Sequence, residues 1–126
     1  MNLANGTIIC ADDDPSTLER LQGLLSQEGF EVLTRASTLA TLECMWKRLP
    51  DLLIIDPTIG HMAGYKLCKQ LRSNPETERV PIVLHTTGDL PEDRGSYDCV
   101  CAKPVDGSVL LLAIRTLLMT RPQQWL

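Results

Sequence analysis

Five side chains that could carry out phosphoryl chemistry lie where apolar runs of this sequence end. They are Asp12 and Asp13 after TIICA, Asp56 after LLII, Thr86 at the end of VPIVLHT, and Lys103 after YDCVCA. Clustered carboxylates raise one another's pKa unless a cation lies between them. A hard divalent ion such as Mg²⁺ accepts one or two carboxylates and leaves positions for phosphate oxygens. An aspartate can also act as the nucleophile in phosphoryl transfer, forming an acyl phosphate.

The five residues can meet only if the segments that carry them lie side by side, and the rest of the sequence predicts this. Short apolar runs alternate with amphipathic segments, which indicates an α/β fold around a single parallel sheet with helices on both faces. The expected strands are Thr7–Ala11, Glu31–Thr34, Leu52–Ile55, Val80–Thr86 and Tyr97–Ala102. Ligands bind an open parallel sheet at the carboxyl ends of its strands, so the five side chains should converge on one edge.

Capping residues predict where helices connect these strands. Asp14 followed by Pro15 predicts the start of a first helix, and Ser37 can cap a second. A third helix is expected at about 64–73 and a last one at about 106–119.

Two of the expected helices carry many apolar residues, and those that the core does not bury could bind a partner. In the second helix, Leu39, Leu42, Trp46 and Leu49 recur at helical spacing, so we expect this face, including Trp46, to lie in the core. The last helix is apolar almost all round over Val109–Met119, and such a helix is normally covered on more than one side. We expect it to leave an exposed patch for a second copy or for an output domain beyond residue 126.

Composition excludes several classes of protein. The 126 residues carry a net charge of −4 and no basic run, which argues against direct nucleic-acid binding by this segment. No apolar run is long enough for a membrane span, and no signal peptide is visible. The five cysteines are odd in number and form no CxxC pair, as expected for a cytoplasmic protein with free thiols. We expect one domain over residues 1–126.

Four motifs together resemble the receiver domain of two-component response regulators: CADDDPS, LLIID, PIVLHTT and CAKP. The resemblance implies a flavodoxin-like fold with strand order 2-1-3-4-5. It implies a module that is no enzyme beyond its own Mg²⁺-dependent phosphorylation and dephosphorylation, served by a sensor histidine kinase or a phosphotransfer protein. It also implies roles for six residues: Asp56 as phosphoacceptor, Asp12, Asp13 and the Thr58 carbonyl as further Mg²⁺ ligands, Thr86 as switch hydroxyl and Lys103 as phosphate-facing lysine.

The sequence departs from this family pattern in three places. Gly60 and Ala63 stand in the loop after Asp56 where relatives often carry proline and aspartate, and Val100 stands where they often carry an aromatic. The segment 88–96 is short, polar and broken by proline, so we expect at most a turn or two of helix there and a shortened or missing fourth helix.

Other interpretations remain open beside this one. One alternative is a receiver-like interaction scaffold that works without phosphorylation. An aspartate-dependent phosphatase or a flavin protein on a similar fold is a further rival. His85 is expected to be a hydrogen-bonded core or rim residue and His61 a solvated loop residue, and Asp14 is expected to cap a helix rather than bind metal.

Overall fold

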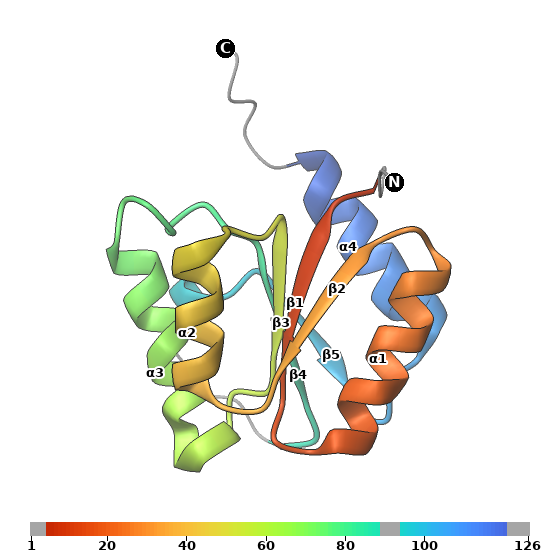
Figure 1. The fold of residues 1–126 in the computed structure, drawn as a ribbon, viewed down its shortest axis with the longest axis horizontal. Coiled ribbons are helices and arrows are strands. Elements are labelled where there is room, and N and C mark those ends of the chain that lie inside the picture. The colour runs from red at the N-terminus through yellow and green to blue at the C-terminus, as the bar shows by residue number, and fades with distance from the viewer. Residues whose placement is uncertain (1–4, 89–93, 121–126) are drawn as a thin grey trace.

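A computed structural model describes residues 5–88 and 94–120. The strands are β1 (Thr7–Ala11), β2 (Glu31–Arg35), β3 (Leu52–Ile55), β4 (Ile82–Thr86) and β5 (Cys99–Ala102). The helices are α1 (Pro15–Gln27), α2 (Thr38–Lys47), α3 (Ile59–Ser73) and α4 (Gly107–Thr120), with a short 3-10 turn at Arg94–Ser96. The strands form one parallel sheet in the order β2-β1-β3-β4-β5. The predicted doubly wound architecture is therefore confirmed (Figure 1).

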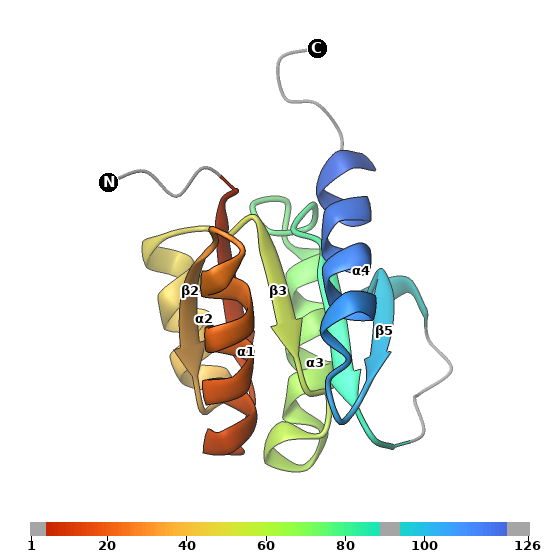
Figure 2. The same cartoon turned by 90° about the vertical axis from the view of Figure 1, so that its right-hand side faces the viewer.

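The helices cover both faces of this sheet, α2 and α3 on one and α1 and α4 on the other (Figures 1 and 2). The central strands β1, β3 and β4 are buried at every position, as expected for parallel strands between two layers of helices. Side chains alternate along each strand, so Ile54 of β3 packs toward α1 and α4 while Ile55 packs toward α2 and α3. This double burial fixes the register and with it the level at which each strand ends.

Local sequence signals start the helices as predicted. The Asp14 side chain accepts a hydrogen bond from the Ser16 N–H at the start of α1, with Pro15 in the first turn. The Ser37 hydroxyl accepts from the Ala40 N–H at the start of α2. Each bond satisfies a donor that the first turn of a helix leaves without an intrahelical partner.

The start of α3 differs from the prediction. The helix begins at Ile59 rather than near Gly64, but Gly60, His61 and Met62 adopt left-handed conformations with φ of 58°, 56° and 74°. The regular part of the helix therefore begins just after this turn, close to the predicted start. Left-handed residues other than glycine are uncommon because Cβ crowds the following carbonyl oxygen.

The predicted buried face of α2 is confirmed only for Leu42, which is partly buried against the core, and is wrong for the other three residues. Leu39 is 66% exposed, Trp46 54% and Leu49, beyond the helix end, 50%. The residues that α2 buries are Thr41, Cys44 and Met45. A helix against one edge of a sheet buries a single stripe, and here the stripe that contains a threonine and a cysteine faces the core.

The region between β4 and β5 agrees with the expected loss of a helix. The segment 94–96 forms one 3-10 turn, while 89–93 lie outside the described residues. Val100 on β5 is exposed. None of the described helices combines the length and hydropathy needed to span a membrane.

Candidate acidic site

An ammonium group lies between two carboxylates at the carboxyl edge of the sheet. The Lys103 Nζ is 2.7 Å from Asp12 Oδ2 and 2.7 Å from Asp56 Oδ2. Asp12 and Asp56 are buried, and Lys103 is partly buried. With both carboxylates ionised, the three groups carry a net charge of −1 in a site largely removed from water.

The sheet itself brings these residues together. β1 and β3 are neighbours, with Ala11 paired to Ile55, so the next residues Asp12 and Asp56 leave the sheet at the same level. The Asp56 N–H donates to the Ala11 carbonyl at 3.0 Å, which continues the ladder up to the carboxylate. On β5, Lys103 follows Ala102 and its N–H donates to the Thr86 carbonyl at 3.1 Å.

Contacts within the site set the charge state of the phosphoacceptor candidate. Burial alone would raise the pKa of Asp56, but hydrogen bonds from Lys103 and Thr58 outweigh it and hold that pKa below its ordinary value. Burial acts against the charged form of Lys103 as well, yet its bonds to Asp12 and Asp56 raise the pKa of this ammonium. Asp56 is therefore an ionised carboxylate and Lys103 a cation at neutral pH.

Thr58 contacts Asp56 in a way that the sequence analysis did not predict. Its backbone N–H donates to Asp56 Oδ1 at 2.8 Å and its hydroxyl donates to the same oxygen at 2.7 Å. This is the Asp-x-Thr turn geometry that short polar side chains commonly form two residues apart, so the spacing was the available signal. The Thr58 carbonyl, which the resemblance assigns to metal, accepts a long 3.4 Å bond from the Met62 N–H.

Asp13 and Thr86 are less closely joined to this group. Asp13 is exposed, and no bond links it to Asp12, Asp56 or Lys103. The Thr86 hydroxyl is buried and accepts a hydrogen bond from the Gly88 N–H at 3.1 Å. Of the residues predicted for the site, the structure places Asp12, Asp56, Thr58 and Lys103 in contact.

His85 is buried as expected but not hydrogen-bonded. Neither ring nitrogen has a hydrogen-bond partner among the described residues, although the side chain is only 1% exposed. Burial and the nearby Lys103 charge lower the pKa of His85. The ring is therefore neutral at physiological pH and adds no positive charge beside the carboxylates.

The thiols near the site behave as small apolar side chains. Cys10 lies two residues before Asp12, and burial together with the charge of Asp12 raises its pKa to about 12. Such a thiol stays protonated at neutral pH and is a poor nucleophile.

The chemistry of the acidic site suits a divalent metal. One ammonium cannot neutralise both buried carboxylates, and Asp12 Oδ2 makes no hydrogen bond beyond its ion pair with Lys103. Oxygen donors of this kind are the ligands that Mg²⁺ prefers. Within residues 5–88 and 94–120, no three His, Cys, Asp or Glu side chains are grouped closely enough to hold a metal by themselves.

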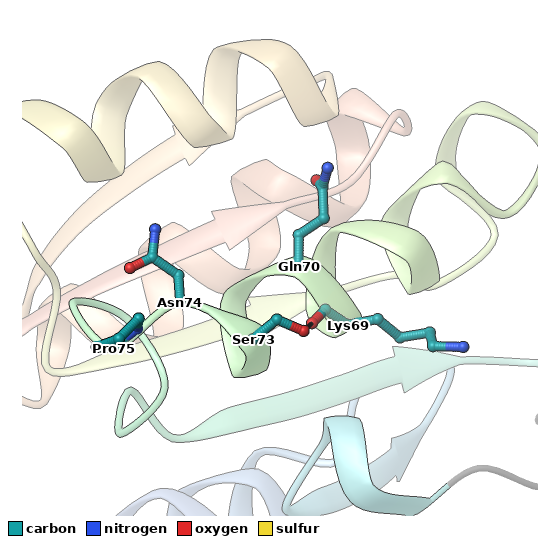
Figure 3. Close-up of a pocket in the computed structure, with 5 residues that line it drawn as sticks. All are labelled: Lys69, Gln70, Ser73, Asn74 and Pro75. Atoms are coloured by element: carbon teal, nitrogen blue, oxygen red, sulfur yellow. Dashed lines mark hydrogen bonds between the residues drawn. The ribbon is translucent and has the colours of Figure 1, made fainter.

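A second concavity lies far from this edge. It is lined by Lys69, Gln70, Ser73, Asn74 and Pro75 at the carboxyl end of α3. Figure 3 shows the side chains of Lys69 and Gln70 pointing in different directions from the helix. None of the residues predicted for phosphoryl chemistry lines this surface, so the acidic edge remains the candidate site.

Sequence comparison places the chain among known proteins. Residues 8–115 match the family model described as the response regulator receiver domain. The chain is 30% identical over 116 residues to the response regulator PleD of Caulobacter vibrioides. It is 33% identical over 117 residues to the phosphate regulon transcriptional regulatory protein PhoB of Rhizobium meliloti. These alignments cover 87% and 88% of this chain but only 25% and 51% of the two relatives.

Structural comparison shows the same fold. The receiver domain of the sensor histidine kinase PA1611 from Pseudomonas aeruginosa matches with a TM-score of 0.82 at 20% identity. The match covers 91% of this chain and 98% of that one, whose crystal structure has a magnesium ion coordinated in the active-site cleft. The family match over most of the chain, the sheet order and the acidic edge agree, and the chain belongs to the response regulator receiver domain family of two-component systems.

Proposed function

We propose that this domain accepts a phosphoryl group on Asp56 from a histidine kinase or a phosphotransfer protein, and that the resulting acyl phosphate shifts its conformation. The observation that carries this proposal is the ion-paired Asp56, ionised at the end of a buried central strand and 2.7 Å from the Lys103 ammonium. An ionised carboxylate held in place is the form that can attack phosphorus.

In the proposed transfer, an Asp56 oxygen forms a bond to phosphorus while the bond between phosphorus and the donor histidine nitrogen breaks. Such transfers need alignment and neutralisation of the equatorial oxygens rather than covalent chemistry by the protein. Lys103 is placed to neutralise one of these oxygens because it already contacts Asp56. The Thr58 N–H and hydroxyl hold the attacking carboxylate in one orientation.

Magnesium is part of the proposal. Asp12, Asp13, Asp56 and the Thr58 carbonyl would hold it, and when bound it would supply positive charge to the transferred group. Asp12 already contacts the same Lys103 ammonium as Asp56, whereas Asp13 would have to turn inward from its exposed position. We therefore expect Asp13 to move more than Asp12 when metal binds.

Thr86 is proposed as the switch residue. Its hydroxyl oxygen accepts from the Gly88 N–H, which leaves the hydroxyl proton available to donate to a phosphoryl oxygen. Moving an equilibrium from 1:99 to 99:1 needs about 5.5 kcal/mol of preference for one state. A few charge-assisted hydrogen bonds, each worth about 1.5–3 kcal/mol, could supply this.

Acetyl phosphate with Mg²⁺ provides the test. Intact mass spectrometry should show one added phosphoryl group on the wild type and none on Asp56→Asn. Thr86→Ala should still be labelled but should show a smaller conformational response to beryllofluoride. Equal labelling of the wild type and Asp56→Asn would reject the assignment of Asp56.

A phosphorylation-independent scaffold is the second candidate, favoured by the separation of Asp13 from the Asp12–Asp56 pair. The two candidates differ in metal linkage. For a receiver that is phosphorylated, Mg²⁺ and beryllofluoride should each tighten the binding of the other, whereas a scaffold should show no such coupling.

A further inference from the structure

The outer face of α2 presents large apolar side chains to solvent. Leu39 and Trp46, seven residues apart on the helix, are 66% and 54% exposed, and Leu49 follows just beyond its end. Residues seven apart lie on one line along a helix, so Leu39 and Trp46 stand on the same side of α2, near its two ends. We call Leu39, Trp46 and Leu49 the α2 face. Tryptophan is among the residues that most often dominate binding energy at interfaces.

A groove with a basic lining runs beside this face, between α2 and the edge strand β2. It is lined by Leu33, Arg35, Ala40, Glu43, Cys44, Lys47 and Arg48. Three of these side chains are cations and one is an anion, in a chain whose net charge is −4. The local charge is therefore opposite in sign to that of the whole molecule.

The cations differ in how far the protein already uses them. Arg48 forms an ion pair with Glu31 and donates to the Thr7 hydroxyl at 3.0 Å. Arg35 donates through one nitrogen to the Thr34 carbonyl at 2.7 Å. Lys47 is exposed, and no ion pair or hydrogen bond joins its ammonium to the described part of the chain. A partner could therefore engage Lys47 without breaking an existing pair.

We propose that the α2 face and its groove bind an amphipathic helix of another protein, with its apolar stripe on Trp46 and Leu39 and its carboxylates toward Lys47. Helix-in-groove recognition uses apolar residues at i, i+3, i+4 and i+7, which suits contacts aligned along a helix. Figure 1 shows that α2 lies on the outside of the molecule, beside the sheet rather than over its carboxyl edge. The inference does not depend on phosphorylation of Asp56.

A second copy of this chain is a poor fit as the occupant. The other described helix with large exposed apolar side chains is α4, at Val109, Leu112 and Met119. Its sequence, GSVLLLAIRTLLMT, contains an arginine and no carboxylate. It therefore offers no negative charge to Lys47, and like charges across an interface oppose association.

Binding can be tested with a designed helical peptide of about 14 residues that has leucines at i, i+3 and i+7 spacing and glutamates on the flanks. A control peptide carries lysine at every glutamate position. In a Trp125→Phe background, Trp46 becomes the single tryptophan, so its fluorescence reports burial of the α2 face. The acidic peptide should shift Trp46 emission to the blue and bind less tightly as salt is added.

Variants distinguish specific binding at the α2 face from non-specific adsorption of the peptide. Leu39→Ala and Lys47→Glu should each weaken binding of the acidic peptide about tenfold, as expected of the minority of interface residues that contribute measurably to affinity. Arg20→Glu changes an exposed cation on α1 and should leave the affinity unchanged. Circular dichroism confirms that each variant is folded.

Three outcomes would overturn the proposal. The first is unchanged Trp46 emission on addition of the acidic peptide, and the second is binding of the lysine peptide as tight as that of the acidic one. The third is concentration-dependent dimerisation of the free chain in sedimentation that Trp46→Ala abolishes, which would assign the α2 face to a second copy.

Discussion

Gly64 packs against the backbone carbonyl of Asp56 so closely that a Cβ at position 64 would lie 2.4 Å from that oxygen. The same Cβ would lie 2.7 Å from Cγ2 of Ile59. Both distances are far below a normal van der Waals contact, so the absence of a side chain at Gly64 sets how near α3 approaches the strand end that carries the acidic site.

Gly64→Ala should therefore displace the first turn of α3 or the backbone of Asp56. We expect a loss of about 1–3 kcal/mol in the free energy of unfolding, as for other overpacked sites, and slower labelling by acetyl phosphate. Urea denaturation and intact mass measure the two effects. Gly23→Ala is the matched control, because nothing lies within 4 Å of a Cβ there, and it should stabilise α1 by about 0.5–1 kcal/mol. Similar behaviour of the two variants would contradict this view of Gly64.

Asp56 should make stability depend on pH in the acid range. Its pKa in the folded state is below the ordinary value of 3.8, so the unfolded chain takes up the proton first as pH falls. The stabilisation is fully present above pH 3.8 and is lost as pH drops through the folded-state pKa. Urea denaturation between about pH 2 and 6 should show a shallower acid decline for Asp56→Asn than for the wild type. Parallel curves would mean that Asp56 titrates alike in both states.

Lys103→Met should leave Asp12 and Asp56 facing each other without their shared cation. Breaking a buried ion pair by removing one partner typically costs about 3–5 kcal/mol, and partial exposure of Lys103 should reduce this to about 3 kcal/mol or less. Added Mg²⁺ should raise the lowered melting temperature of this variant part of the way back, because it can replace the missing positive charge between the two carboxylates. Lys47→Met, at an exposed lysine, is the control and should change stability little. No difference between the two variants would show that the central ammonium is not structurally important.

His61 and Met62 hold left-handed backbone conformations beside the site. A left-handed residue other than glycine costs about 1–2 kcal/mol of backbone strain. Substitution by glycine removes this strain, but part of the gain is lost because glycine has more conformational freedom in the unfolded chain. His61→Gly should raise the free energy of unfolding by up to about 1 kcal/mol, measured by thermal melting. Gly60→Ala, at φ 58°, should lower it. A decrease in His61→Gly would argue that this turn is not held in the left-handed region in solution.

The exposed side of α4 is the surface that we expect a second copy or an output domain to use. Leu112 and Met119 are 68% and 79% exposed, whereas Leu110 is completely buried. If the domain dimerises through this helix, a Leu112→Glu, Met119→Glu variant should sediment as a folded monomer while the wild type forms dimers. Leu110→Glu is not a useful probe because it should unfold the protein. Equal monomeric masses for the wild type and the double variant would exclude the dimer.

The sequence alone determined the architecture and most of the site. Strands such as TIICA and LLII are apolar at every position, and parallel strands covered on both faces have this pattern. Once the sheet is parallel, the residues after each strand must meet at one edge, so the convergence of Asp12, Asp56 and Lys103 could be predicted without coordinates. The helix caps at Asp14 and Ser37 could also be predicted from the sequence, because they depend only on neighbouring residues.

Tertiary structure decided what local patterns leave open. Helical spacing shows which residues of α2 share a face but not which face meets the sheet, so Trp46 is exposed although its pattern suggested burial. The two bonds from Thr58 to Asp56 and the close approach of Gly64 depend on how the β3–α3 turn packs, and the exposure of Asp13 depends on the conformation of the loop after β1. Spacing along the chain specifies which side chains can be neighbours, whereas packing between elements sets the distances at which they interact.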